Sequence, residues 1–170
     1  MRILVTGKNG QLGKSLHKLV SEKKYDNEFI FVGREEVDLS NNNSIINYFD
    51  NHDNHDKFDI IINCAAYTAV DKAEEEQELA NQVNHLAVKQ LAGIAKEQKA
   101  KLIYISTDYV FDGESDKPYL ESDTPNPINV YGKTKLAGER TLQEIMPTNA
   151  ISLGLVGCIL STVITLLKPC

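Results

Sequence analysis

The sequence predicts an α/β fold in which a doubly wound parallel sheet carries helices on both faces. Short apolar segments alternate with helical segments, a glycine-rich turn follows the first apolar segment, and the later apolar segments are nearly continuous. Alternation of this kind implies right-handed crossovers between parallel strands. Uninterrupted apolar strands are typical of a sheet that is buried on both faces.

The expected elements follow one another as far as residue 146. Strands are predicted at residues 2–6, 29–32, 58–64 and 101–106. The helix after the glycine turn is predicted because Leu12, Leu16, Leu19 and Val20 recur at helical spacing. Further helices are expected at about residues 45–49, 76–99 and, after the prolines at 125 and 127, 130–146. The order of strand, glycine turn and helix predicts a Rossmann-like domain.

Length, charge and cysteine content limit the classes of partner. The 170 residues, 42% of them hydrophobic, suffice for one domain with a real core. The net charge of -6 gives no electrostatic basis for binding nucleic acid or an anionic membrane, so a small-molecule partner is expected. The three cysteines, Cys64, Cys158 and Cys170, form no close pair, which favours a reducing cytoplasm. We expect no signal peptide, because no basic region precedes a long apolar one near the N-terminus.

Three glycines directly follow the first strand. Gly7 permits a tight turn, Gly10 lets the backbone approach a pyrophosphate, and Gly13 lets the helix pack closely on the sheet. The helix N-terminus would then face the phosphates. The spacing is GxxGxxG, and a purely structural turn is the alternative reading.

Arg34 follows the second predicted strand, where the residue that reads the ribose 2′ position of a dinucleotide is expected. A basic residue there favours NADPH. The adjacent Glu35 and Glu36 weaken that preference, so NADH remains an alternative, as does a solvated surface role for Arg34. Asp38 and Leu39 lie a little further on, where they could border the adenine.

Tyr131 and Lys135 are four residues apart in a predicted helix and therefore share a face. A phenol titrates near ~10 when unperturbed, and a neighbouring cation lowers that pKa. Tyr131 is thus a candidate acid or base near neutral pH. The carboxyl ends of the strands would bring the glycine turn, residues 65–67 and residues 106–108 together at one edge of the sheet.

Three stretches carry a resemblance to a known family. Residues 65–74 (AAYTAVDKAE), 106–113 (STDYVFDG) and 131–139 (YGKTKLAGE) together resemble dTDP-4-dehydrorhamnose reductases, which belong to the extended short-chain dehydrogenase/reductase superfamily. The resemblance covers residues 1 to about 146. It implies NADPH-dependent reduction of the C4 keto group of dTDP-4-dehydro-L-rhamnose, the last step of dTDP-L-rhamnose synthesis.

The resemblance also implies a role for each matching position. Cofactor contacts are implied for Gly10, Gln11 and Leu12 at the pyrophosphate, for Asp38 and Leu39 at the adenine, and for Ala65, Ala66 and Tyr67 at the ribose and nicotinamide. Thr107, Tyr131 and Lys135 would form the catalytic trio, with Asp108 near the sugar. Tyr131 would protonate the developing alkoxide, Thr107 would hydrogen-bond the same oxygen, and Lys135 would lower the tyrosine pKa and hold the nicotinamide ribose.

Two related protein classes and one metal-like cluster offer alternative interpretations of the sequence. Sugar-nucleotide 4,6-dehydratases resemble Thr-Asp-Glu where this chain has Thr107-Asp108-Tyr109, so the missing second carboxylate favours reduction. The noncatalytic regulatory beta subunit of methionine adenosyltransferase shares much of the pattern and is the main binding-module alternative. Residues 52–56 (HDNHD) are interpreted as a solvated loop, and no metal site is predicted.

The resemblance ends near Asn149, so the Rossmann-like domain is predicted at residues 1–148 and an aberrant apolar tail at 149–170. Residues 151–167 carry no charge, and a buried helix or a marginal membrane span are the other readings. Codons can be chosen for 149–170 so that another frame encodes a family-like continuation, which favours a frameshift just before Asn149. The chain would then lack most of the sugar-nucleotide pocket, and an inactive, poorly soluble product is one expected outcome. A homodimer is compatible with the full-length family but is not predicted for this chain.

Overall fold

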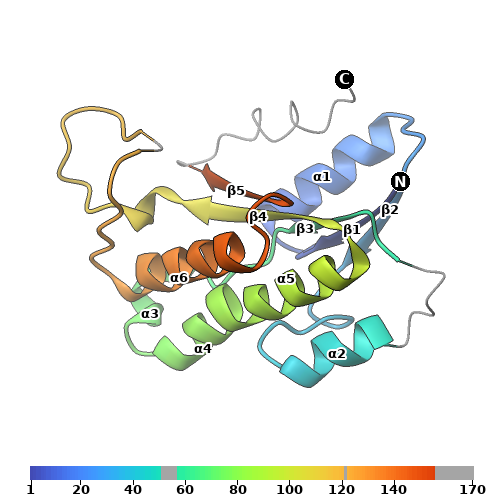
Figure 1. Cartoon of the computed structure of the whole chain (residues 1–170), viewed down its shortest axis with the longest axis horizontal. Helices are drawn as coiled ribbons and strands as arrows, with labels where there is room; N and C mark the ends of the chain where they lie inside the picture. Colours follow the sequence, from blue (N-terminus) through green and yellow to red (C-terminus); the bar gives the residue numbers. More distant parts are fainter. Residues whose placement is uncertain (51–56, 121, 156–170) are drawn as a thin grey trace.

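The computed structural model describes residues 1–50, 57–120 and 122–155. Its centre is a five-stranded, all-parallel sheet in the order β2-β1-β3-β4-β5 (Figure 1). The strands are β1 (Arg2–Thr6), β2 (Glu28–Val32), β3 (Ile60–Asn63), β4 (Lys101–Thr107) and β5 (Ala150–Leu155). The predicted α/β class with a Rossmann-like, doubly wound parallel sheet is confirmed.

Strand register brings the carboxyl ends of the central strands to one edge. Thr6, the last residue of β1, pairs with Val32 on one side and Asn63 on the other. From β1 the chain continues to β2 on one side of the sheet, and from β3 it continues through β4 to β5 on the other side. The topological switch point, where the direction of strand addition reverses, therefore lies between β1 and β3. Ligands of open α/β sheets bind in the crevice beside such a point.

Helices cover the two faces of the sheet unequally (Figure 1). Helix α1 (Gln11–Glu22) lies on one face, and α2 (Asn42–Asp50), α5 (Ala87–Gln98) and α6 (Val130–Ile145) lie on the other. Alternate residues of β1 reach the two sides, because Ile3 and Val5 pack with Leu16 of α1 whereas Leu4 packs with Leu91 of α5. The period of two along each strand thus divides the core into two layers.

The long helical segment predicted at residues 76–99 contains a π turn. It consists of α4 (Gln77–Asn81), the π-helical η1 (Gln82–Leu86) and α5 without an intervening loop. Insertions of this kind often mark functional sites. Two further short elements, α3 (Val70–Ala73) and the 3-10 helix η2 (Asp108–Val110), follow the ends of β3 and β4 and were not predicted.

Residues 150–155, the first part of the segment predicted to be an aberrant tail, form strand β5. Ile103 of β4 pairs with Ile151, and Ser106 pairs with Gly154. The readings of residues 151–167 as a buried helix or membrane span are therefore wrong for residues 151–155, and residues 156–170 lie outside the described part. The domain boundary at residue 148 stays a prediction. Within the described residues, no helix combines the length and apolar character needed to cross a membrane.

Candidate functional site

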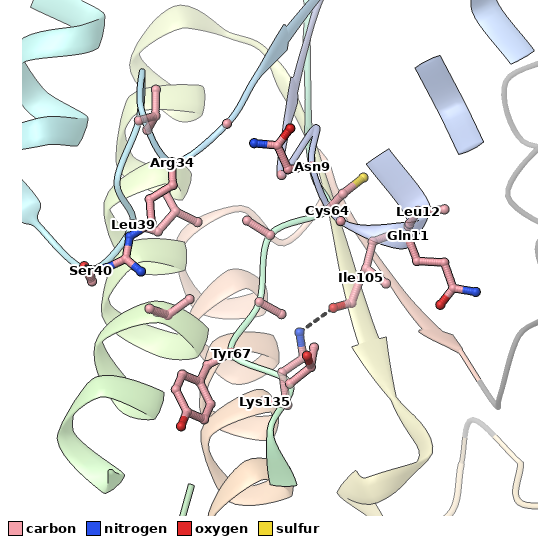
Figure 2. Close-up of a pocket in the computed structure, with 18 of the residues that line it drawn as sticks. Asn9, Gln11, Leu12, Arg34, Leu39, Ser40, Cys64, Tyr67, Ile105 and Lys135 are labelled. Carbon is pink, nitrogen blue, oxygen red and sulfur yellow. Dashed lines mark hydrogen bonds between the residues drawn. The ribbon is translucent and has the colours of Figure 1, made fainter. Parts of the chain in front are cut away.

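A cavity of about 650 Å³ opens at the carboxyl ends of β1, β3 and β4 (Figure 2). It gathers most of the predicted site residues from separate parts of the chain. Its lining includes Gly7, Gly10, Gln11, Leu12, Arg34, Asp38, Leu39, Ala65, Ala66, Tyr67, Thr107, Tyr131 and Lys135. Of the predicted residues, Gly13 and Asp108 lie outside this lining.

The glycine turn is shaped by two close backbone approaches. Gly7 has φ +76°, a left-handed conformation that favours glycine, and a Cβ atom there would lie 2.7 Å from the backbone nitrogen of Ala65. A Cβ atom on Gly13 would overlap the carbonyl oxygen of Gly7, so Gly13 supports the turn from beneath. Gly10 is the N-cap of α1 and lines the cavity with Gln11. The start of α1 therefore presents backbone N–H groups where an anion can bind.

Arg34 lies at one side of the cavity with Leu39 and Ser40 (Figure 2). Its Nε is 3.2 Å from a carboxylate oxygen of Asp38, and its Nη2 donates to the Ser40 hydroxyl at 3.2 Å. Three-quarters of the Arg34 side chain is exposed, at 76%. The guanidinium is thus oriented by its neighbours while it remains accessible to a ligand.

Lys135 lies at the other end of the cavity, buried to 1% exposure (Figure 2). Its Nζ donates a 2.5 Å hydrogen bond to the carbonyl oxygen of Ile105 and lies 4.1 Å from the centroid of the Tyr104 ring. Burial lowers the pKa of Lys135 to about 7, partly opposed by the carboxylate of Glu139. A proton on this amine is therefore exchangeable near neutral pH.

The expected lowering of the Tyr131 pKa by Lys135 is wrong for this structure. Burial raises the pKa of Tyr131, partly opposed by the Thr107 hydroxyl, which favours the phenolate by hydrogen bonding. The reason is geometric, because the ammonium group of Lys135 is directed to the Ile105 carbonyl. Tyr131 is consequently a neutral phenol at neutral pH, the form that can donate a proton.

Several contacts fix the start of α6, which carries Tyr131. The Asn129 side chain accepts from the backbone nitrogen of Gly132 at 2.7 Å, as an N-cap residue does. Glu74, far away in the sequence, accepts from the backbone nitrogen of Val130 at 2.8 Å. Glu74 therefore caps a helix that begins far from it in the sequence, a role that the sequence analysis did not predict.

Asn84, in η1, is a second residue that the sequence reading missed. It is 1% exposed, and its side chain exchanges hydrogen bonds with the backbone of Tyr67, accepting at 2.9 Å and donating at 3.1 Å. Its amide also donates to the Thr134 hydroxyl at 3.2 Å. Asn84 thereby joins the loop of Tyr67 to α6. Its polar neighbours Asn81, Gln82 and His85 left no local signal in the sequence that singled Asn84 out.

Asp108 lines a second cavity of about 1010 Å³ beside the first. Thr107 borders both cavities and donates to the Asp108 carboxylate at 3.1 Å. The ring of Tyr109, which also borders the second cavity, lies edge-on to Tyr131 with centroids 5.5 Å apart. A reactant in the second cavity would thus meet a ligand of the first near Thr107 and Tyr131.

No cluster of three or more metal-ligating side chains occurs among the residues that the structure describes. The HDNHD segment at 52–56 lies outside those residues. Cys64, at the end of β3, is a free thiol whose pKa is raised to about 12 by burial. A reactive thiolate at this position is therefore disfavoured.

Known proteins match the chain over most of its length. A dTDP-4-dehydrorhamnose reductase of Aggregatibacter actinomycetemcomitans is 41% identical over 151 residues, which are 88% of this chain and 49% of that protein. The crystal structure of such a reductase from Clostridium acetobutylicum superposes with a TM-score of 0.82 at 40% identity, covering 91% of this chain and 52% of that one. A Bacillus anthracis reductase solved with NADP gives 0.79 at 37% identity, with 90% and 52% covered.

The family resemblance seen in the sequence is confirmed by these matches. The chain spans about half the length of the curated relatives it matches. The family described as RmlD substrate binding domain matches residues 1–152, which include the glycine turn, Thr107 and the Tyr131–Lys135 pair. The chain therefore belongs to the RmlD substrate binding domain family.

Proposed function

We propose that this chain carries the cofactor site and the proton-donating residues of an NADPH-dependent dTDP-4-dehydrorhamnose reductase. The reaction would reduce the C4 keto group of dTDP-4-dehydro-L-rhamnose to give dTDP-L-rhamnose. The observation that carries the proposal is that Thr107, which borders both cavities, lines the first one together with Tyr131 and Lys135. The relatives named dTDP-4-dehydrorhamnose reductase support it.

The residues of the first cavity fit a dinucleotide. Gly7 and Gly10 allow close approach to the N-terminus of α1, where a pyrophosphate would be stabilised by backbone N–H groups. Asp38 and Leu39 would border the adenine, and Ala65, Ala66 and Tyr67 the nicotinamide ribose. Arg34 at the adenosine side favours NADPH over NADH. The NADP and NADPH named for solved relatives from Bacillus anthracis and Pseudomonas aeruginosa agree with that preference.

When bound, NADPH supplies the hydride that reduces the C4 carbonyl. Thr107 would donate a hydrogen bond to the oxygen as negative charge develops there, and Tyr131 would transfer its phenolic proton to the same oxygen. The raised pKa of Tyr131 keeps the phenol protonated for this step. Lys135 would then stabilise the resulting phenolate once its ammonium leaves the Ile105 carbonyl. Asp108 would lie near the sugar.

Residues 1–148 are proposed as the family-like unit, followed by a segment that a frameshift before Asn149 accounts for. β5 uses the first residues of that segment, and Ser152 and Gly154 border the second cavity. Resequencing the gene around the Asn149 codon is the test. A family-like continuation in another reading frame is the expected result, and its absence would contradict the proposed frameshift. The cytoplasm is the proposed compartment, and homodimerisation is proposed only for a full-length protein.

The assay measures NADPH oxidation with dTDP-4-dehydro-L-rhamnose. It compares the 170-residue chain with a chimera in which residues 1–148 replace the matching part of the Aggregatibacter reductase. Turnover by the chimera is the expected result. If both proteins bind NADPH and neither turns over, the result would favour a regulatory subunit resembling methionine adenosyltransferase beta. Turnover by the chimera alone would identify the 170-residue chain as an inactive product.

A further inference from the structure

Lys8, in the glycine turn, forms ion pairs with two acidic residues of the loop after β2. Its Nζ lies 3.0 Å from a carboxylate oxygen of Glu35 and forms a second, shorter contact with Glu36. The backbone nitrogen of Lys8 also donates to the carbonyl oxygen of Val32 at 3.0 Å. The first and second βα loops are therefore joined by both backbone and side chain.

The same two carboxylates have further partners that hold them in place. Glu36 accepts from the backbone nitrogen of Gly33 at 2.7 Å through the oxygen that does not pair with Lys8. Asn9 donates to both carboxylate oxygens of Glu35 at 3.4 Å. Glu35 lies against Gly33, since a Cβ atom on that glycine would be 2.6 Å from a Glu35 oxygen.

These carboxylates lie beside the position that distinguishes the two nicotinamide cofactors. Gly33 and Arg34 both line the cofactor cavity, and the residue after the second strand reads the ribose 2′ position. A 2′-phosphate is an anion that two unpaired carboxylates would repel, whereas a 2′-hydroxyl would be a hydrogen-bond donor to them. The state of Glu35 and Glu36 should therefore affect NADP more than NAD.

We propose that Lys8 determines cofactor specificity by sequestering Glu35 and Glu36, which leaves Arg34 as the dominant charge at the 2′ position. Lys8 acts through the two carboxylates and is a positioning residue without contact to the cofactor. Arg34 is held toward the cavity by Asp38 and Ser40. This inference rests on the proposed function, because it needs a dinucleotide in the cavity.

The experiment measures the dissociation constants of NADP⁺ and NAD⁺ by titration calorimetry on the 170-residue chain at low ionic strength. The variants are Lys8→Met, Glu35→Gln/Glu36→Gln and the triple substitution. Lys14→Met, an exposed lysine on α1, is the matched control for loss of one positive charge. Each measurement is repeated at high salt, where exposed charges interact less.

Lys8→Met should raise the ratio of the NADP⁺ to the NAD⁺ dissociation constant about fivefold, as expected for exposed charges. The triple variant should return to within about twofold of the ratio of the unsubstituted chain, because the carboxylates no longer need a counterion. Lys14→Met should leave the ratio unchanged.

Two results would overturn the inference and leave the dinucleotide site intact. An equal loss of NADP⁺ and NAD⁺ binding in Lys8→Met would make Lys8 a purely structural link between the loops. A loss of NADP⁺ binding that persists in the triple variant would make Lys8 a direct phosphate ligand. If the unsubstituted chain binds neither cofactor, the proposed function fails together with the inference.

Discussion

The ammonium group of Lys135 donates a 2.5 Å hydrogen bond to the carbonyl oxygen of Ile105, a main-chain group of β4. The buried amine thus depends on a backbone carbonyl of β4 and on the face of the Tyr104 ring for its stabilisation. Both groups are neutral, so the positive charge of Lys135 is only partly compensated. This arrangement explains why its pKa falls to about 7.

Stability should depend on pH through Lys135. Its pKa of about 7 in the folded chain lies below the usual 10.5, so the unfolded chain binds more protons between these values. The free energy of unfolding contributed by this group therefore rises with pH across that window. The Lys135→Met variant lacks this titrating group, so its unfolding free energy should not show this pH dependence. The unfolding free energy of the unsubstituted chain minus that of the variant should therefore increase by about 3–5 kcal/mol from pH 6.5 to pH 10.

Chemical denaturation of both proteins at several pH values measures this difference. Lys133→Met removes an exposed lysine of the same helix and serves as the control. A difference between the Lys135→Met variant and the unsubstituted chain that stays constant over this pH range would show that burial does not lower the lysine pKa.

Gly13→Ala should damage the dinucleotide site through packing. The new Cβ atom would overlap the carbonyl oxygen of Gly7, so the turn must shift at a cost of about 1–3 kcal/mol in unfolding free energy. NADPH affinity, measured by fluorescence titration, should fall as the turn moves. Gly93→Ala is the control, because a Cβ atom there meets nothing within 4 Å, and it should stabilise α5 by about 0.5–1 kcal/mol. Equal effects of the two substitutions would contradict the packing argument.

Glu74→Ala should loosen the start of α6. Glu74 accepts a hydrogen bond from the backbone nitrogen of Val130, one of the groups that a helix leaves without an internal partner. Its loss should lower the unfolding free energy by about 1 kcal/mol. Glu75→Ala removes the same charge from the neighbouring exposed position and should change stability less. Thermal denaturation compares the variants, and indistinguishable transition temperatures would rule out the cap.

The fold was largely predictable because its signals are local. The strand at 2–6 was predicted with its observed bounds, and the helix expected at 130–146 ends one residue earlier in the structure, at Ile145. Apolar periodicity and the prolines before residue 130 were sufficient for these elements. Strand β5 was not predicted, because residues 150–155 lack the family pattern and their strand structure is seen only in their pairing with β4.

The sequence predicted most of the residues that line the first cavity, but not the hydrogen bonds that hold them in place. The predicted residues that line the first cavity come from motifs whose chemistry can be read from residue type and spacing. Glu74, Asn84 and Lys8 act through partners far away in the sequence, so no local pattern marks them. The pKa of Tyr131 was predicted in the wrong direction because spacing along a helix does not show where the ammonium group of Lys135 points.

The most direct test of the proposed chemistry is the Tyr131→Phe substitution in the chimera that contains residues 1–148. The change removes only the phenolic oxygen, so the ring should still pack edge-on to Tyr109. We expect kcat for NADPH-dependent reduction of dTDP-4-dehydro-L-rhamnose to fall at least about a hundredfold, while the NADPH dissociation constant changes less than about twofold. An unchanged kcat in the phenylalanine variant would contradict the assignment of Tyr131 as the proton donor.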